Sequence, residues 1–434
     1  MKRIKLQISN WLALQPQWVF AVFATLAALS TYSCMYAFRK PFTVGFFHGE
    51  GFLGVDLKIW IITFQVIGYT LSKFLGIKYV SELEKSNRAN YIVGLLLISE
   101  IALLFFWLLP APYNVVCMLF NGLPLGMIWG VVFSYLEGRK LTELLGAGLS
   151  VSFILASGFV KTVGEWVMIS FGVSEFAMPF ITGLIFILPL VVSVFLLDCL
   201  PEPTAEDEKL RTKRTAMNSA ERKKFLNEFF FGIVFLVFTY IILTVFRDLR
   251  DNFSAEIWSG LGHSGNPAIF TLTEIPVAFF TLLILALITF IKSNYKAFNS
   301  ILLIVSIGLF LIFVAGILYN WQWISGEVWM VLLGVGLYLG YIPFNAFLYE
   351  RLISSFKYVS NIGFVMYVSD AFGYLGSTIV IFFKNFVSAD VIWLDFIKDS
   401  SIIVSAIGIV AIFLAHQFFK NKYNSNFKLL NNEN

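Results

Sequence analysis

Twelve charged residues interrupt stretches of the sequence that are otherwise apolar. The basic ones are Arg39, Lys40, Lys73, Lys161, Arg247 and Arg250, and the acidic ones are Glu100, Glu165, Asp248, Asp251, Glu274 and Asp370. A charge exposed to lipid is costly, so each of these side chains should face a cavity or a partner inside the protein. Arginine binds a phosphate or carboxylate through two parallel hydrogen bonds, and lysine adds a compact charge. The basic set therefore predicts a site for a small anion.

Arg39 and Lys40 are the strongest candidates for this site. They follow 21 uncharged residues and precede Pro41, which perturbs a helix. Two of the acids have open alternatives. Glu100 could be a structural partner or a proton carrier, and Asp370 could bridge to a basic residue of the other half or could itself titrate.

Several of the other charges could be structural. Lys161 and Glu165 are four residues apart, so they could neutralise each other on one helix. Arg247 and Asp251 have the same spacing. Arg250 and Asp251 could also lie near a membrane surface, where charge is ordinary. The sequence leaves these alternatives open.

The elements that position these charges must be membrane-spanning helices. Of 434 residues, 58% are hydrophobic and only 13% are charged, and 48 are phenylalanine. The mean hydropathy is +0.80. A soluble domain is about half apolar and about a quarter charged, so an aqueous fold could not bury this much apolar surface. We expect an all-α protein in a lipid bilayer.

The composition also excludes several kinds of site. The three cysteines (Cys34, Cys117 and Cys199) lie in or beside apolar segments without metal-type spacing, and the three histidines are scattered. We therefore expect buried cysteines, no metal and no cofactor. The net charge of +4 is not gathered on a soluble domain, so no nucleic-acid partner is expected. No nucleophile or metal constellation lies at membrane depth, which argues against an enzyme.

The N-terminus resembles a signal peptide only superficially. Lys2, Arg3 and Lys5 precede an apolar stretch, but that stretch, Trp18–Phe38, is 21 residues long and no small-residue cleavage site follows it. We expect a retained spanning helix.

Twelve apolar stretches are long enough to cross a bilayer. They begin near Trp18, Ile59, Tyr91, Val115, Leu144, Phe176, Phe229, Ala268, Phe298, Val328, Tyr358 and Ser400. One long polar segment, residues 201–227, separates six stretches from the other six. We expect two six-helix bundles, 1–200 and 228–434, joined by this cytoplasmic linker.

The distribution of lysine and arginine orients the chain. If the N-terminus is cytoplasmic, 22 of these residues fall in inside segments and three (Lys58, Lys384 and Lys398) fall in outside segments. Cytoplasmic loops of membrane proteins are enriched in Lys and Arg. Both termini should therefore lie in the cytoplasm.

The two halves resemble each other weakly. The first stretch ends in Arg39 and Lys40, and the seventh ends in the run from Arg247 to Arg250, at a similar depth. The fourth and tenth stretches both carry clustered glycines. Such six-plus-six similarity is typical of parallel repeats in transporters.

Four short motifs carry a resemblance to a known family. Tyr36-Ala-Phe-Arg39-Lys40-Pro41-Phe42 resembles the first-helix Arg-Lys signature of the organophosphate:phosphate antiporters, a branch of the major facilitator superfamily. Ser72-Lys73-Phe74 is similar to that branch's second helix, and Gly122 with Gly126-Met127-Ile128-Trp129 is similar to its fourth. Phe372-Gly373-Tyr374-Leu375-Gly376 resembles its eleventh helix. A group of bacterial facilitator-like proteins shares the Phe-Arg-Lys-Pro signature.

The resemblance implies roles for individual residues. Arg39 would hold a phosphoryl group with Lys73 beside it, and Lys40 would form a switchable ion pair with Asp251. The family's second phosphate arginine falls on Arg247 or Arg250, and we prefer the deeper Arg247. Glu274 precedes Ile275-Pro276 and looks like the family's eighth-helix glutamate.

Two departures accompany these matches. The family's fifth-helix histidine aligns near Ala156, and no histidine is present on that helix. The loop after the second helix, residues 76–88, lacks the usual Gly-x-x-x-Asp-Arg-type motif. The classical exchange reaction is therefore less well supported than the fold.

The sequence thus predicts two bundles that rock about a midplane anion site. The residues expected at the anion are Arg39, Lys73, Arg247, Lys161 and Tyr36. Those expected to exchange partners between states are Lys40, Asp251, Glu274 and Asp370. Inorganic phosphate or protons would be the coupling ion, and the protein would be a monomer in the cell inner membrane. The alternative is a non-transporting membrane sensor on the same scaffold.

Overall fold

The computed structural model describes most of the chain as helices. The described residues are 2–48, 51–81, 83–137, 139, 141–203, 207, 219–288, 290–356, 362–387 and 391–432. One small antiparallel hairpin, β1 (Gly51–Phe52) and β2 (Val55–Asp56), is the only sheet among them. Cys34, Cys117 and Cys199 are buried, as predicted.

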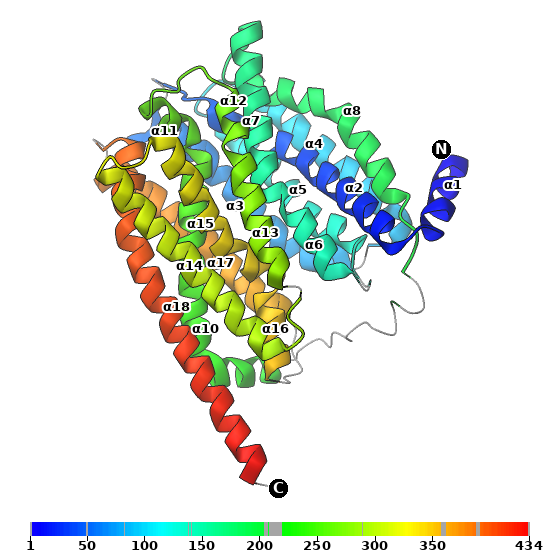
Figure 1. Cartoon of the computed structure of the whole chain (residues 1–434). Coiled ribbons are helices and arrows are strands. Elements are labelled where there is room, and N and C mark those ends of the chain that lie inside the picture. The colour runs from blue at the N-terminus through cyan, green and yellow to red at the C-terminus, as the bar shows by residue number, and fades with distance from the viewer. Residues whose placement is uncertain are drawn as a thin grey trace. The chain divides into compact units, whose positions relative to one another are not determined.

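The helices before residue 204 are α1 (Lys2–Ala13), α2 (Gln17–Ala37), the 3-10 turn η1 (Pro41–Val44), α3 (Leu57–Ser81), the 3-10 turn η2 (Lys85–Asn87), α4 (Arg88–Leu108), α5 (Val115–Ser134), α6 (Thr142–Ser150), α7 (Ser152–Phe171) and α8 (Met178–Asp198) (Figure 1). The later helices are α10 (Ser219–Asn252), α11 (Ser254–Gly260), α12 (Ala268–Leu272), α13 (Glu274–Ile288), α14 (Asn294–Asn320), α15 (Gly326–Ala346), α16 (Leu348–Ser355), α17 (Ile362–Val387) and α18 (Trp393–Asn432).

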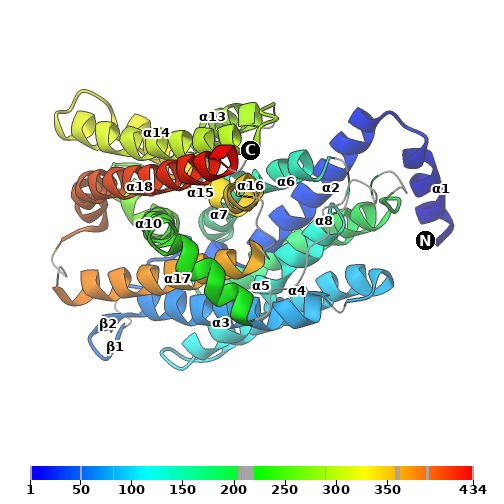
Figure 2. The same cartoon turned by 90° about the horizontal axis from the view of Figure 1, so that it is seen from below.

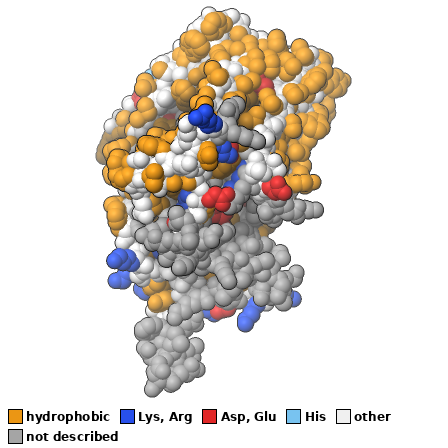
Figure 3. Space-filling view, turned by 90° about the vertical axis from the view of Figure 1, so that its right-hand side faces the viewer, with side chains coloured by type: hydrophobic (Ala, Val, Ile, Leu, Met, Phe, Trp, Pro, Cys, Tyr) orange, Lys and Arg blue, Asp and Glu red, His pale blue; other side chains and the backbone are white. Residues whose placement is uncertain are grey.

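Helices long and apolar enough to span a membrane lie where the sequence predicts them. Eleven spans within the described residues are long and apolar enough to cross a bilayer, and they begin at or near eleven of the twelve predicted starts. The remaining predicted start, Tyr358, lies outside the described residues, and α17 follows it from Ile362. Hydrophobic side chains cover much of the face shown in Figure 3, as expected for a protein surrounded by lipid.

Two of the spans each consist of two helices separated by a single residue. The fifth consists of α6 and α7, with Val151 between them, and the eighth consists of α12 and α13, with Thr273 between them. Hydropathy alone predicted each of these spans as one continuous stretch, because a single-residue break does not change the average apolarity.

The chain divides into two compact units. Unit 1 comprises Met1–Arg211, Arg250–Ala278 and Ile381–Trp393, and unit 2 comprises Thr212–Leu249, Phe279–Val380 and Leu394–Asn434. The division into bundles 1–200 and 228–434 stays a prediction. Much of the predicted linker, residues 204–206 and 208–218, lies outside the described residues, and α10 already begins at Ser219.

Residues 250–278 belong to unit 1 because they pack closely on α7. A Cβ atom on Gly158 would lie 2.3 Å from the Phe270 carbonyl oxygen, so the two backbones are in contact. Thr162 Oγ1 donates to the Pro267 carbonyl at 2.7 Å. The end of the seventh span and the start of the eighth are therefore held against the fifth.

The end of α2 places the two basic residues of the first span. The helix stops at Ala37, and Pro41 opens the turn η1, whose residues are all buried. Proline has no N–H and cannot continue the helical ladder. Arg39 and Lys40 therefore lie at a change of chain direction, where their side chains can diverge.

Helices α3 and α5 touch backbone to backbone within unit 1. A Cβ on Gly68 would lie 2.2 Å from the Leu119 carbonyl oxygen, and a Cβ on Gly122 would lie 2.2 Å from the Gln65 carbonyl oxygen. In Figure 2 their labels lie next to each other in the lower half of the view. Small residues permit this approach in membrane proteins.

This contact yields a testable expectation. We expect Gly122→Ala to lower the melting temperature and the folded yield, since the added methyl group has no space and overpacking costs about 1 to 3 kcal/mol. The matched control is Gly94→Ala on α4, where a Cβ would meet no atom within 4 Å. Equal melting temperatures for the two purified variants would contradict the close approach.

Candidate anion-binding site

Arg39 and Lys73 share one aromatic ring in unit 1. The Arg39 Cζ atom lies 3.9 Å from the centre of the Tyr69 ring and 5.9 Å from that of Tyr36. Lys73 Nζ lies 5.4 Å from the centre of the same Tyr69 ring. Tyr69 and Lys73 are one helical turn apart on α3, so they lie on one face. We call Tyr36, Arg39, Tyr69 and Lys73 the Arg39 group.

A buried amide network fixes the backbone that carries Arg39. Asn121 Nδ2, on α5, donates to the Phe38 carbonyl at 2.9 Å and to Ser99 Oγ at 2.6 Å. Gln65 Nε2, on α3, donates to Asn121 Oδ1 at 2.7 Å and to the Arg39 carbonyl at 3.0 Å. Asn121 is fully buried. Helices α3 and α5 thus hold the chain at the base of the Arg39 side chain, and α4 supports Asn121 through Ser99.

Sequence reasoning missed this network. The available signal was a lone asparagine in the apolar stretch of α5, because polar residues inside membrane spans commonly bond across helices. Ser99 and Gln65 gave no comparable signal, since their helices also carry charged residues.

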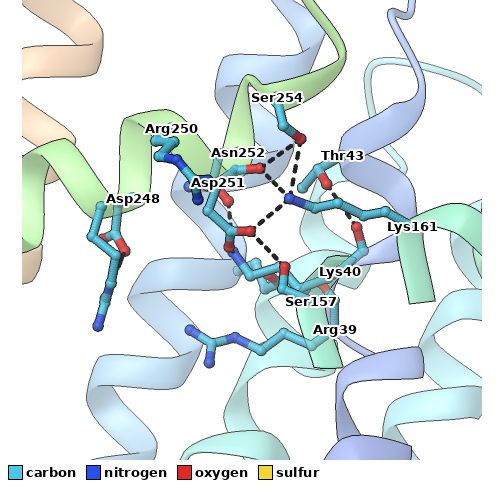
Figure 4. A network of polar contacts seen from close by, with 12 residues as sticks. Arg39, Lys40, Thr43, Ser157, Lys161, Asp248, Arg250, Asp251, Asn252 and Ser254 are labelled. Carbon is cyan, nitrogen blue, oxygen red and sulfur yellow. Dashed lines mark hydrogen bonds and ion pairs between the residues drawn. The ribbon is translucent and has the colours of Figure 1, made fainter. Parts of the chain in front are cut away.

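A second cluster in unit 1 centres on Asp251, at the end of α10 (Figure 4). Lys40 Nζ lies 2.5 Å from Asp251 Oδ2, and Lys161 Nζ lies 2.6 Å from Asp251 Oδ1. Ser157 also donates to Asp251 Oδ1. The carboxylate therefore bridges the first span to the fifth. We call Lys40, Asp251 and Lys161 the lysine–aspartate cluster.

Neighbouring oxygens accept further hydrogen bonds from the two lysines. Lys40 Nζ donates to Asn252 Oδ1 at 2.7 Å, and Lys161 Nζ donates to Ser254 Oγ at 3.1 Å and to the Asp251 carbonyl. The lysine side chains are only 7% and 3% exposed. Two lysines and one carboxylate leave the cluster with one excess positive charge. In Figure 4 the Arg39 guanidinium points away from it.

Two further ion pairs lie in unit 1. Arg250 Nη1 lies 2.7 Å from Glu274 Oε1, and the Arg250 side chain is 5% exposed. Lys58 Nζ lies 2.5 Å from Glu256 Oε1 and donates to the Thr43 carbonyl at 2.7 Å. Lys58, which the sequence places among the outside residues, is buried in this ion pair.

Unit 2 has its own arginine over a tyrosine. The Arg247 Cζ atom lies 3.9 Å from the centre of the Tyr341 ring, on α15, and Arg247 Nη2 lies 2.6 Å from Asp248 Oδ1. Tyr240 stacks on Tyr341 with ring centres 5.3 Å apart, and its hydroxyl donates to Asp370 Oδ1. Arg247 thus contacts one of two stacked tyrosines, and Asp370 bonds the other.

The structure decides several alternatives that the sequence left open. Lys161 bonds Asp251 and Ser254, so the Lys161–Glu165 pair is not formed within the described residues. Lys161, predicted near the anion, lies in the lysine–aspartate cluster. Arg247 pairs with Asp248, its neighbour, and Arg250 is buried and pairs with Glu274.

Chemically, the Arg39 group can hold an anion. A guanidinium over an aromatic ring is oriented by the ring, while its N–H edge remains able to bond an oxyanion. The lysine–aspartate cluster can do something different. Its pairs are buried, and breaking them without replacement partners would leave charges in a low-dielectric interior. The lysine–aspartate cluster can therefore stay closed, or it can open if each charge gains a new partner.

Solved structures show the class of fold. The chain is similar to a D-xylose–proton symporter, with a TM-score of 0.63 and 15% identity over 93% of this chain and 98% of that one. It is also similar to a bacterial homologue of the human lysosomal transporter Spinster (TM-score 0.60, 12% identity, 93% and 98% covered). The human organic anion transporter MFSD10 gives a TM-score of 0.55 at 13% identity, with 92% and 100% covered. The fold is that of the major facilitator superfamily.

The sequence comparison then defines the family. Residues 41–422 match the Family of unknown function (DUF5690), and the chain belongs to that family. No curated protein sequence matches the chain.

Proposed function

We propose that this protein is a secondary transporter of a small organic anion, with a phosphorylated compound as the preferred substrate class. The observation that carries the proposal is the Arg39 group. Two cations from different spans, Arg39 and Lys73, lie over one tyrosine ring at membrane depth. The facilitator fold supports it, because its spans surround a substrate path.

Alternating access requires contacts that open and close, and the buried ion pairs supply them. Lys40 and Lys161 both bind Asp251, and Arg250 binds Glu274. In our proposal these pairs, together with Asp370, exchange partners between two states. Such exchange keeps every buried charge compensated, which avoids the cost of an isolated one.

The finer assignments rest on the sequence. The Arg39-Lys40 and Ser72-Lys73 motifs support the organophosphate:phosphate antiporter branch, with Arg247 as the second anion ligand. The bias of 22 basic residues to three supports cytoplasmic termini and an inner-membrane location. Phosphate or protons would be the coupling ion, and the transporter would act as a monomer.

Flux through the purified protein tests the proposal. The full chain is reconstituted into liposomes loaded with inorganic phosphate, and uptake of labelled glycerol phosphate, hexose phosphate and phosphate is measured. We expect saturable uptake of at least one phosphorylated compound, several-fold above protein-free liposomes. Binding of these anions without flux would instead favour a membrane sensor, and neither binding nor flux would remove the anion assignment.

A further inference from the structure

Glu100 is a buried acid that the proposed transport site does not use. It lies in the middle of α4 and is 4% exposed. Both carboxyl oxygens are buried and have no hydrogen-bond partner among the described residues. The carboxyl group packs directly on α8, where a Cβ on Gly183 would lie 2.1 Å from Glu100 Oε2. The glycine therefore makes the space that the acid occupies.

The elements packed against α4 offer Glu100 no cation. Helix α5 contains no charged residue, and Cys117 is its only ionisable group. On α8 the only charged residue is Asp198, at its last position, where Lys5 binds it. The turn η2 carries Lys85, fifteen residues before Glu100, which is about 22 Å along a helix.

An unpaired charge in such a place is strongly disfavoured. An ionised carboxylate in an apolar medium loses its hydration, and the elements packed against α4 provide no cation to compensate. The carboxyl group therefore binds a proton and becomes neutral. The neutral acid costs only the hydrogen bond that its O–H fails to make. The geometry of α4 and α8 thus selects the protonated form.

We propose that Glu100 is a proton-binding site that couples anion transport to proton movement. This role rests on the proposed transport function. The step is simple: the acid Glu100–COOH releases H⁺ to water and becomes Glu100–COO⁻ when α4 and α8 separate enough to admit water, and it takes the proton back when they close. A proton that moves with the anion reduces the net charge carried.

The anion site is structurally linked to Glu100. Ser99, the preceding residue, faces α5 and binds Asn121, whose amide holds the Phe38 carbonyl. Gln65 extends the same network to the Arg39 carbonyl. A displacement of α4 relative to α8 would therefore move Ser99 and Asn121, and with them the backbone that carries the Arg39 guanidinium.

Infrared spectroscopy of the purified full chain tests proton binding without any substrate. The protonated carboxyl band at neutral pH should lose intensity in Glu100→Gln, which keeps the size and shape of the side chain. The control is Glu175→Gln, a half-buried carboxylate that accepts N–H bonds from Phe46 and Phe47, and it should leave the band unchanged. An unchanged band in a folded Glu100→Gln protein would overturn the proton site.

Transport in liposomes tests the coupling. With labelled glycerol phosphate as probe, Glu100→Gln should lose most pH-gradient-driven accumulation, roughly tenfold or more, while counterflow exchange persists. Glu100→Asp keeps the acid and should retain part of the accumulation, which separates proton binding from packing. If accumulation by the wild-type protein does not depend on the pH gradient, the proposal that Glu100 couples anion transport to proton movement is wrong. If wild-type protein moves no anion at all, the transport proposal fails, whereas a band removed by Glu100→Gln still establishes the proton site.

Discussion

Replacing Arg39 by lysine is expected to weaken anion binding about 30-fold or more, while the melting temperature stays close to that of the wild type. Lysine keeps the charge but loses the planar fork that bonds an oxyanion twice. Loss of one partner of a buried charged hydrogen bond typically costs about 2 to 5 kcal/mol, and about 1.4 kcal/mol is a factor of ten in affinity. Ligand affinity and thermal stability are measured on the same purified variant at fixed salt.

The control for Arg39→Lys is a second arginine over a tyrosine. The Arg88 Cζ atom lies 5.4 Å from the centre of the Tyr135 ring, and Arg88 Nη1 donates to the Ser134 carbonyl at 3.1 Å. Arg88 lies at the start of α4, apart from the Arg39 group. Arg88→Lys should leave affinity unchanged. Normal affinity in a folded Arg39→Lys protein would exclude Arg39 from the site.

Asp251→Asn should destabilise the protein strongly. The substitution leaves Lys40 and Lys161, 7% and 3% exposed, without their shared counter-charge. Removal of one partner from a buried ion pair typically costs about 3 to 5 kcal/mol, because an uncompensated charge stays buried. We expect a marked fall in melting temperature and loss of transport in the liposome assay.

Two further variants test whether buried, uncompensated charge destabilises Asp251→Asn. Asp395→Asn breaks an ion pair with Lys398, 3.1 Å long, in which the Asp395 side chain is 48% exposed. Such surface pairs contribute about 0 to 1 kcal/mol, so this variant should be nearly neutral. The triple variant Lys40→Met, Asp251→Asn, Lys161→Met removes all three charges and should recover most of the lost melting temperature. A triple variant as unstable as Asp251→Asn would show that charge burial is not the cause.

The fold could be predicted well because one physical quantity dominates it. Apolar stretches of sufficient length must span a bilayer, and their starts were therefore readable from hydropathy alone. The breaks at Val151 and Thr273 were not readable, since they depend on local backbone geometry rather than on composition.

The candidate site was only partly predictable. Charges at membrane depth were visible in the sequence, and the resemblance suggested that Arg39 and Lys73 are neighbours. Spacing along one helix shows only which residues share a face. It allowed a Lys161–Glu165 pair, whereas Lys161 bonds Asp251 on another span. Partners across helices depend on helix rotation and depth, which also explains why Asn121 and Glu256 were missed.

The glycine contact between α3 and α5 has a mechanical consequence. Two helices in backbone contact at Gly68 and Gly122 leave no space for sliding side chains, so the pair moves as a single stiff lever that carries Tyr69. The fifth and eighth spans, by contrast, each contain a one-residue interruption, at Val151 and at Thr273. The distance between two spin labels, one on α3 and one on α5, should therefore stay constant while the protein works, and it can serve as the internal reference for distances to other helices of unit 1.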